Sequence, residues 1–555
     1  MKRYIKYTLP LVVAVVVTGV WAMRDDMGLG RNMEIMVNMM RELSLQYVDE
    51  VKPDKLMSDG AQGMVQNLDP YTQYMSEEEM NDFELMATGK YGGIGATIRM
   101  KRDSSGVVIA QPYKGSPSDL AGLKIGDKFI RIDGEDVTRC TTAEISSKLK
   151  GTPGTKVKLA VQRLLSGKVE ELEITRARIA IPGVPYAGFV EDGIAYIRHA
   201  DFTDGCYDDM RAMVEKLRQQ QPIQGVVLDY RDNGGGSVSE AVKILSMFVP
   251  KGSKVLTMKG RSEQSKREYR TDAIPVLGDV PVVALISGSS ASASEIVCGA
   301  LQDMDRAVLM GQRSYGKGLV QTVVPVGYNA YLKLTTAKYY IPSGRCVQRI
   351  NYTHQSNARD EVVPDSLINE FKTTNGRKVY DGKGLMPDVK LEPEYISTFA
   401  ILLYNLGFIE DFLDEYMRRN PNMQVDNKTF SITDADYESF IEFMSDKDVP
   451  YQSRTREALE LLKKTSKEER YDDAFIGDLN QIESKLKDQK LDNLRHYRAE
   501  IEDLINGDVV LRHNYYEGVV EYNLRSDSAV IKAVELLRDP ERYNKILKEQ
   551  DTQRN

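Results

Sequence analysis

A serine-rich stretch in the middle of the chain contains the residue type that a hydrolase uses as a nucleophile. In SGSSASASEIVCGALQD, residues 287–303, five of the first eight residues are serines. An apolar strand, PVVALIS, precedes them and a helix is expected to begin near Ala293. Free N–H groups at a helix start suit a developing oxyanion. The competing interpretation is structural, because Ser292 followed three residues later by Glu295 fits a capping box.

A lysine further along the chain, Lys317 in GQRSYGKGLVQTV, is the candidate base. A lysine accepts a proton at neutral pH only if burial lowers its pKa from about 10.4 to about 7 or 8. The apolar segments LVQTVVPV and AVLMG can supply that burial. Strand alternation places Lys317, Leu319 and Gln321 on one side, so Gln321 is a candidate to hold the amine. The alternative is a surface lysine in a glycine turn.

The same lysine lies in a GxxxxGK pattern that resembles a phosphate-binding loop. Gly318 stands where the Ser or Thr ligand of Mg²⁺ would be, and the following residues predict a strand instead of a helix. A nucleotide site is therefore a weaker interpretation.

A third segment, DYRDNGGGS at residues 229–237, joins a predicted strand to a predicted helix through three glycines. Glycines allow backbone N–H groups to approach an oxyanion closely. A run of glycines on its own also fits an ordinary turn.

The elements around these segments change in type along the chain. Short helices are expected over Asn32–Phe83, and short strands with glycine turns form a β-rich module over Lys90–Arg163. Alternating strands and helices then predict an α/β domain with partly parallel strands. Beyond Pro393 the chain is rich in Lys, Glu and Asp at helical spacing, which predicts a separate helical domain.

Composition is that of a folded, water-soluble protein. Charged residues make up 28% and hydrophobic residues 41%, and 555 residues require several domains of about 150 residues. The net charge of −8 does not indicate the basic surface that nucleic-acid binding requires. The four cysteines and four histidines are scattered, so no metal site, cofactor or disulfide framework is expected.

The first 25 residues have the pattern of an export segment. Basic residues precede an apolar run, Leu9–Met23, and no acidic residue comes before Asp25. This charge order keeps the amino end in the cytoplasm and sends the rest across the membrane. Both a cleaved signal peptide and an uncleaved inner-membrane anchor fit the segment.

Together these segments resemble the carboxyl-terminal processing peptidases, also called tail-specific proteases. The resemblance extends over Asn32 to about Leu391. Its motifs, in order, are YVDEV, LDPYTQY, GKYGGIGATI, GSPSDLAGLKIGD, LDYRDNGGG, SASASEIVCGALQD, GRCVQ and GKGLMPDV. Gly234 stands where the family often has a proline.

The resemblance implies a Ser–Lys dyad with Ser292 as nucleophile, Lys317 as base and Gln321 beside it. It places the oxyanion hole at the N–H of Ala293 and the N–H of Gly235 or Gly236. No histidine is then needed, because a desolvated lysine amine can take and return the proton.

The β-rich module resembles a PDZ domain. Its GGIG loop, which consists of Gly92, Gly93, Ile94 and Gly95, matches the place where such domains capture a terminal carboxylate while the peptide adds a strand. Arg163 resembles a basic residue that couples the PDZ domain to the catalytic core.

The implied fold is an α/β core of ClpP/crotonase-like type, a mixed sheet with βαβ units, with an inserted PDZ domain and helical N- and C-terminal regions. The expected boundaries are a signal peptide or anchor at 1–25, a helical region at 26–87, the PDZ domain at 88–165, the peptidase core at 166–393 and the helical domain at 394–555.

The expected function is that of an ATP-independent serine endopeptidase of the bacterial cell envelope, periplasmic or otherwise extracytoplasmic. Its expected partners are proteins or peptides with free C-terminal tails. A homodimer through the helical regions and a regulatory adaptor are further candidates. The alternative from a different class is a non-catalytic PDZ scaffold or holdase that binds tails without cutting them.

Overall fold

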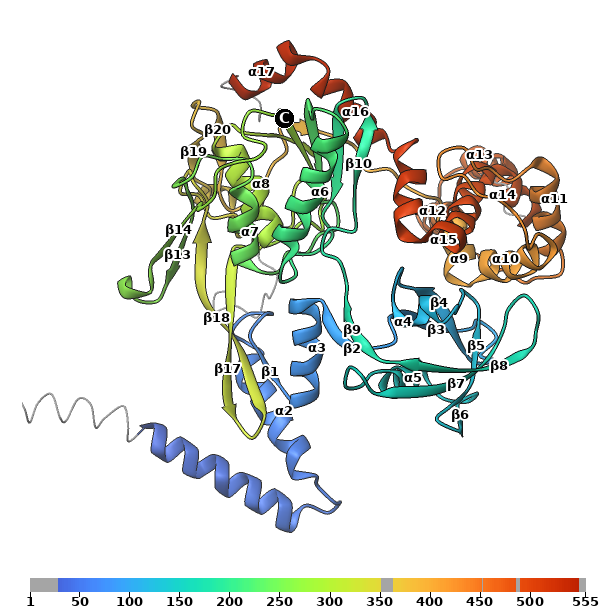
Figure 1. The fold of residues 1–555 in the computed structure, drawn as a ribbon, viewed down its shortest axis with the longest axis horizontal. Helices are drawn as coiled ribbons and strands as arrows, with labels where there is room; N and C mark the ends of the chain where they lie inside the picture. The colour runs from blue at the N-terminus through green and yellow to red at the C-terminus, as the bar shows by residue number, and fades with distance from the viewer. Residues whose placement is uncertain (1–27, 351–362, 452, 486–489, 549–555) are drawn as a thin grey trace, which may run out of the picture. The chain divides into compact units, whose positions relative to one another are not determined.

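The computed structural model describes residues 28–350, 363–451, 453–485 and 490–548 (Figure 1). The predicted signal peptide or anchor, residues 1–25, lies outside these residues. Within the described ranges, no helix has both the length and the apolar character that a membrane crossing requires. The chain divides into two compact units, of which the first contains residues up to Asp82 with Val320–Ala337 and the second contains most of the rest.

The first unit consists of helices and a β-hairpin. A helix covers residues 28–46, and the other elements are α2 (Pro53–Val65), β1 (Gln73–Met75) and most of β17 (Leu319–Gly327) and β18 (Ala330–Tyr340). β1 pairs antiparallel with β18. Several apolar side chains of the first helix are exposed, namely Met33, Met36, Val37, Leu43 and Leu45.

The β-rich module of the second unit is an antiparallel sheet in the order β3-β4-β5-β7-β8, with β6 beside β5. Its elements are β2 (Lys90–Gly93), β3 (Ala96–Met100), β4 (Val107–Pro112), α4 (Pro117–Leu120), β5 (Lys128–Ile132), β6 (Glu135–Asp136), α5 (Thr142–Leu149), β7 (Lys156–Gln162), β8 (Val169–Thr175) and β9 (Ala177–Ala180), and α3 (Glu77–Thr88) precedes them. The sheet continues past residue 165, the expected end of this domain, because β8 pairs along the whole length of β7.

The α/β core contains a six-stranded sheet in the order β10-β11-β12-β15-β16-β21. β10 is antiparallel to β11, and the other neighbours are parallel. The sheet strands are β10 (Tyr186–Glu191), β11 (Ile194–Arg198), β12 (Gly225–Asp229), β15 (Val282–Ile286), β16 (Val308–Gly311) and β21 (Val389–Lys390). The hairpins β13 (Lys254–Gly260) with β14 (Arg267–Arg270) and β19 (Glu370–Lys372) with β20 (Lys378–Tyr380) accompany it.

The connections of this sheet place the core's own helices on one face. The strands β11, β12, β15 and β16 are neighbours in chain order, and right-handed crossovers between parallel strands then put every connecting helix on the same side. These helices are α6 (Cys206–Gln220), α7 (Val238–Leu245) and α8 (Ala293–Asp303), which gather beside one another (Figure 1). The other face of the sheet must be covered by a different part of the chain.

That second face is covered by the last helices of the chain. Side chains of α16 (Ser528–Leu537) and α17 (Pro540–Lys548) share one buried cluster with alternate residues of the sheet strands, namely Val227, Val283, Leu285, Val308 and Met310. The tail beyond residue 393 is therefore not a wholly separate body, because its final helices complete the core of the α/β sheet.

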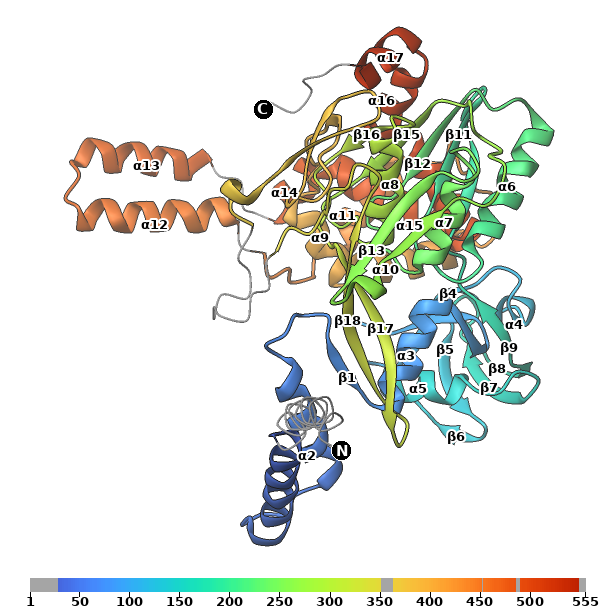
Figure 2. The ribbon, with the colours of Figure 1, turned by 90° about the vertical axis from the view of Figure 1, so that its left-hand side faces the viewer.

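A second buried cluster is formed by side chains of α9 (Thr398–Asn405), α10 (Phe408–Arg419), α11 (Asp434–Phe443), α14 (Lys490–His496) and α15 (Arg498–Leu524). The remaining C-terminal helices, α12 (Arg454–Glu468) and α13 (Asp473–Lys485), contribute none of their described residues to that cluster. α12 and α13 run side by side as a helical hairpin (Figure 2). α15 breaks at Asn514 and Tyr515, and Tyr515 has a positive φ of 59°.

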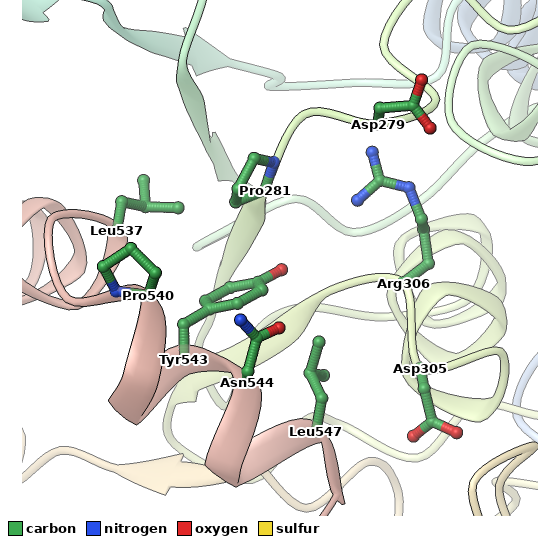
Figure 3. A pocket seen from close by; sticks show the side chains of 9 residues that line it. All are labelled: Asp279, Pro281, Asp305, Arg306, Leu537, Pro540, Tyr543, Asn544 and Leu547. Atoms are coloured by element: carbon green, nitrogen blue, oxygen red, sulfur yellow. The ribbon is translucent and has the colours of Figure 1, made fainter.

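A small cavity of about 200 Å³ lies where α17 meets the start of β15 (Figure 3). The Tyr543 hydroxyl, which lines it, accepts a hydrogen bond from Val282 N and donates to Val282 O, each at 3.0 Å. Arg306 on the opposite side donates to the carbonyl oxygens of Phe248 and Val280 at 2.9 and 2.6 Å. The Tyr543 bonds fix α17 against the strand that leads to the serine-rich turn.

We predict that Tyr543→Ala lowers the free energy of unfolding by about 3–5 kcal/mol, because it removes a buried ring from the sheet cluster. Tyr543→Phe keeps the ring but leaves the polar backbone groups of Val282 without this partner, so we expect a loss of about 1–3 kcal/mol. Urea unfolding followed by circular dichroism measures both values. An unchanged unfolding midpoint for Tyr543→Ala would contradict the assignment of α17 to the core.

Candidate active site

Ser292 lies at the sharp turn between β15 and α8. Its backbone has φ 56° and ψ −114°, in the positive-φ region that residues with a side chain rarely adopt. A residue held there costs on the order of 1–3 kcal/mol and persists only where its surroundings impose the conformation. The structure around this turn supplies such constraints.

Three neighbouring serines tie the turn to the loop that follows β12. Ser290 Oγ donates to Tyr230 O at 2.8 Å, and Ser294 Oγ donates to Asn233 O at 2.9 Å. Ser287 Oγ accepts from Asp232 N at 3.1 Å. The serines around Ser292 therefore have structural roles, and they fix the glycine loop against the turn.

The glycine loop approaches Ser292 so closely that a side chain would not fit. A Cβ on Gly235, which has φ 105°, would lie 2.7 Å from Ser292 Cβ and 2.9 Å from Ala293 N. The N–H of Gly235 donates to Asn233 Oδ1 at 2.9 Å, while Asn233 Nδ2 donates to His199 O at 2.8 Å. The structure thus brings Gly235 next to Ser292 and Ala293.

The Glu295 carboxylate joins the serine turn to the lysine segment. Its Oε2 accepts hydrogen bonds from Ser292 N at 3.0 Å and Lys317 N at 2.8 Å. Its Oε1 accepts from Gly316 N at 2.8 Å and Ser314 Oγ at 2.5 Å. One carboxylate therefore sets the backbone positions of the candidate nucleophile and the candidate base at the same time.

Burial is the main influence on the pKa of Glu295. The side chain is fully buried, and burial raises its pKa to about 7, although the four donors from Ser314, Lys317, Gly316 and Ser292 act in the opposite direction. Glu295 therefore gains its full negative charge only above neutral pH, and the hydrogen bonds that it accepts are strongest in that form.

A second side chain joins the same two segments through their carbonyl groups. The hydroxyl of Tyr339, a residue near the end of β18 with 1% exposure, lies 2.5 Å from Lys317 O and 3.1 Å from Ser292 O. Glu295 and Tyr339 together hold the N–H and C=O groups of both residues. Neither role follows from the sequence alone, although the capping-box pattern draws attention to Glu295.

Lys317 is half-buried in a turn between β16 and β17. β17 begins at Leu319, so Lys317 precedes the strand and no helix follows the GxxxxGK pattern. Gln321 lies on β17 within the first unit, where its Nε2 donates to Thr335 Oγ1 at 3.2 Å. That contact fixes Gln321 on the β17–β18 hairpin, and its placement beside the lysine amine stays a prediction.

Of the four GGIG residues, Gly92 and Gly93 form the end of β2 and pair with β9, and only Ile94 and Gly95 connect β2 to β3, which is an edge strand of its sheet. A Cβ on Gly95, which has φ 79°, would lie 2.4 Å from Ser116 Cβ. Its carbonyl oxygen accepts hydrogen bonds from the hydroxyls of Ser116 and Ser118 at 2.8 and 2.7 Å. Helix α5 packs against β3, so loop, edge strand and helix lie together as a peptide groove would require.

Arg163 does not contact the α/β core through its hydrogen bonds in the described structure. It donates to Asp127 Oδ2 at 2.7 Å, to Glu170 Oε2 at 2.7 Å and to Gly122 O at 2.8 Å, all within the β-rich module.

Comparison with known families assigns three parts of the chain. Peptidase family S41 matches residues 193–368, a PDZ domain matches residues 108–163, and the C-terminal helical domain of probable PDZ-proteases matches residues 399–537. Fold and site thus define a serine peptidase with a PDZ domain and a helical C-terminal domain.

Curated relatives give the family. A carboxy-terminal-processing protease of Bartonella bacilliformis is 34% identical over 330 residues, which cover 59% of this chain and 74% of the relative. A probable CtpA-like serine protease of Staphylococcus aureus is 29% identical over 385 residues, covering 68% and 73%. The chain belongs to peptidase family S41, as a carboxy-terminal-processing serine protease.

Among solved structures, the photosystem II D1 C-terminal processing protease matches with 25% identity and a TM-score of 0.35, covering 65% of this chain and 88% of that chain. The PDZ domain of a carboxy-terminal protease from Vibrio cholerae, solved with a peptide, matches with 29% identity and a TM-score of 0.15, covering 17% and 99%.

We predict a pH-dependent effect of Glu295→Gln on stability. Because the folded-state pKa of about 7 lies above the ordinary value of 4.5, the folded protein holds this proton where the unfolded chain has lost it. The free energy of unfolding of the wild type relative to Glu295→Gln should therefore fall by roughly 3 kcal/mol between pH 4.5 and about pH 7, then level off. Urea unfolding over this pH range measures the difference.

Glu144→Gln is the matched control, because Glu144 caps α5 on the surface and its hydrogen bonds with Thr141 lower its pKa. The corresponding difference for this variant should rise with pH through the acidic range instead of falling. A pH-independent difference for Glu295→Gln would contradict the raised pKa.

Proposed function

We propose that this protein is an exported, ATP-independent endopeptidase that cuts proteins near their C-termini with a Ser292–Lys317 dyad. The observation that carries the proposal is the single Glu295 carboxylate that binds the backbone N–H groups of both residues. A chain that needed Ser292 only as a helix cap would not need a buried carboxylate shared with a lysine segment.

In the proposed reaction, the neutral Lys317 amine accepts the proton of Ser292 as Oγ attacks the scissile carbonyl carbon. The tetrahedral intermediate collapses when the same ammonium returns the proton to the leaving amine, and the peptide bond breaks to give an acyl-enzyme. Water, deprotonated by Lys317, then attacks the ester carbonyl carbon. The lysine ammonium returns that proton to Ser292 Oγ as the bond from Oγ to the acyl group breaks and the new C-terminus leaves. The strained Ser292 backbone keeps this residue at the edge of the turn.

The proposed oxyanion hole consists of Ala293 N–H and a glycine N–H of the adjacent loop. Donors aimed at the developing charge are worth on the order of 100- to 1000-fold in rate each. Since Gly235 N–H already donates to Asn233, we assign the second donor to Gly236, with Gly235 available if the loop shifts. Gln321 remains our proposed partner of the lysine amine.

Tail recognition is assigned to the PDZ domain. The substrate tail would add a strand to the free edge of β3, and the loop of Gly92, Gly93, Ile94 and Gly95 would receive its carboxylate. The edge position of β3 and the packing of α5 beside it support this assignment. Apolar pockets next to such a groove favour apolar terminal residues.

The cellular setting also stays a proposal. The basic start and apolar run of residues 1–25 support export to the bacterial cell envelope, with or without an inner-membrane anchor. A homodimer, a regulatory adaptor and a ClpP/crotonase-like fold of the core are likewise predictions from the sequence. The alternative function, a non-catalytic tail-binding scaffold, predicts binding without cleavage.

The central test uses an unfolded reporter with an apolar C-terminal tail, analysed by mass spectrometry. We expect wild type to cleave it and Ser292→Ala to lose on the order of 1000-fold or more in rate. Lys317→Arg should be equally inactive, because a guanidinium stays protonated. Amidation of the tail should lower kcat/KM by about tenfold or more through loss of charge-assisted hydrogen bonds.

Circular dichroism and binding of a labelled tail peptide control for folding of the variants. Binding of the tail by wild type with no cleavage of any reporter would favour the scaffold. Cleavage by Ser292→Ala at the wild-type rate would overturn the proposed nucleophile.

We further predict that Tyr339→Phe lowers kcat by about tenfold, because the carbonyl groups of Ser292 and Lys317 lose a shared donor. The aromatic ring stays, so tail binding and KM should change little. Steady-state kinetics with the tailed reporter separate the two constants. A change in KM alone would show that the hydroxyl has no part in placing the dyad.

A further inference from the structure

An ion-pair network connects the C-terminal helical domain to the loop that contains the oxyanion glycines. Asp229, at the end of β12, is fully buried and receives Arg231 Nη2 at 2.6 Å and Nε at 3.0 Å. Burial acts to raise the Asp229 pKa, but the hydrogen bonds and charge of Arg231 outweigh it and lower the pKa overall. The negative charge of Asp229 is therefore stabilised by its contact with Arg231.

Arg231 also binds the helical domain. Its Nη1 and Nη2 donate to Asp527 Oδ1 and Oδ2 at 3.1 and 2.6 Å, in a two-point contact. Asp527 is the N-cap of α16 and accepts from Ala529 N and Val530 N at 3.0 and 3.1 Å. The first residues after β12 are thus held between the α/β sheet and α16.

The position of Arg231 gives this contact a consequence for the active site. Arg231 is followed directly by Asp232, which has a positive φ of 61°, and by Asn233, whose carbonyl oxygen binds Ala291 N and Ser294 Oγ. The glycines next to Ser292 come immediately afterwards. A shift of Arg231 would be transmitted along a short, hydrogen-bonded segment to the oxyanion loop.

The same helical domain also forms ion pairs with the PDZ domain, at the strand proposed to receive the substrate tail. Basic residues at the end of β3 and just after it meet an acidic row on α10. Lys101 Nζ binds Asp414 Oδ2 at 3.0 Å, and Arg102 Nε binds Asp411 Oδ2 at 3.0 Å. Asp414 is 3% exposed and is also paired with a cation of α15 in its own domain.

Further contacts strengthen this attachment. Arg99 on β3 pairs with Glu410, and the Arg102 guanidinium lies 4.5 Å from the centre of the Phe408 ring. Tyr515, at the break in α15, donates its hydroxyl to Asp119 in α4 at 2.6 Å. The tail-binding strand is therefore anchored to a domain that also reaches the oxyanion loop through Asp527.

We propose that the C-terminal helical domain is a brace that links the PDZ strand β3 to the oxyanion loop, and that Asp527 is a positioning residue for the peptidase reaction. The inference rests on the proposed Ser292–Lys317 chemistry and adds a role for the helical domain. Asp527 touches neither substrate nor reacting atoms and acts through Arg231. The acidic row of α10 holds the other end of the brace.

Asp527→Asn tests the catalytic end, because asparagine caps a helix as well as aspartate does but cannot form the charged two-point contact with Arg231. In full-length protein we expect kcat for the tailed reporter to fall 10- to 100-fold with KM within twofold. Inhibition by a peptide boronic acid, which needs the oxyanion site, should weaken by a similar factor. Asp527→Glu should recover part of the loss.

Asp426→Asn is the matched control in the same domain, since Asp426 also accepts hydrogen bonds from two backbone N–H groups, those of Lys428 and Thr429, at the surface. It should leave both constants unchanged. A wild-type kcat for Asp527→Asn, in protein whose cleavage Ser292→Ala abolishes, would overturn the positioning role while leaving the proposed function intact. No cleavage by wild type would instead count against the proposed function.

A charge swap tests the PDZ end. Asp411→Arg should lower kcat/KM for a tailed reporter at least threefold and leave cleavage of a short, tail-less peptide within twofold. Combining it with Arg102→Asp restores an opposite-charge pair and should recover most of the loss. An equal loss on both substrates, or no recovery in the double variant, would contradict the brace.

Discussion

The candidate active site depends on one buried carboxylate. Glu295 accepts hydrogen bonds from the backbone N–H groups of Ser292 and Lys317, which come from separate segments of the chain. A buried charge is costly unless donors surround it, so the four donors must be present for the residue to ionise at all. In turn, the hydrogen bonds to the carboxylate fix the positions of the two segments that carry the donors.

The sheet topology imposes a second constraint. With the connecting helices α6, α7 and α8 on one side, the apolar residues of the opposite side need a cover that the S41 region of residues 193–368 does not itself contain. Helices α16 and α17 supply it. The C-terminal helical domain is consequently part of the core, and its contact with Arg231 follows from where α16 must begin.

Short-range patterns were enough to predict much of the site. The strand before Ser292, the helix after it and the triple glycine at residues 234–236 all have local signatures, and the structure brings them together. The role of Glu295 could not be predicted, because the same residue pattern fits a simple cap and only tertiary structure brings Lys317 N to its carboxylate. Tyr339 gives no local signal at all, since its partners are two distant carbonyl groups.

Longer-range features were less accessible. The PDZ sheet extends to Thr175 because β8 pairs with β7. The sequence of β8 is exposed and charged and shows little apolar alternation, so it gives little signal of a strand. Likewise, the alternating charges of the C-terminal helices indicated solvated faces but not that α16 packs on a distant sheet.

The late position of α16 and α17 in the chain has a consequence for biosynthesis. A ribosome makes the serine turn and the lysine segment well before it makes Ser528–Lys548, so the sheet has one uncovered apolar face during most of translation. The sheet that carries the serine turn therefore has its second face covered only after the last helices of the chain have docked.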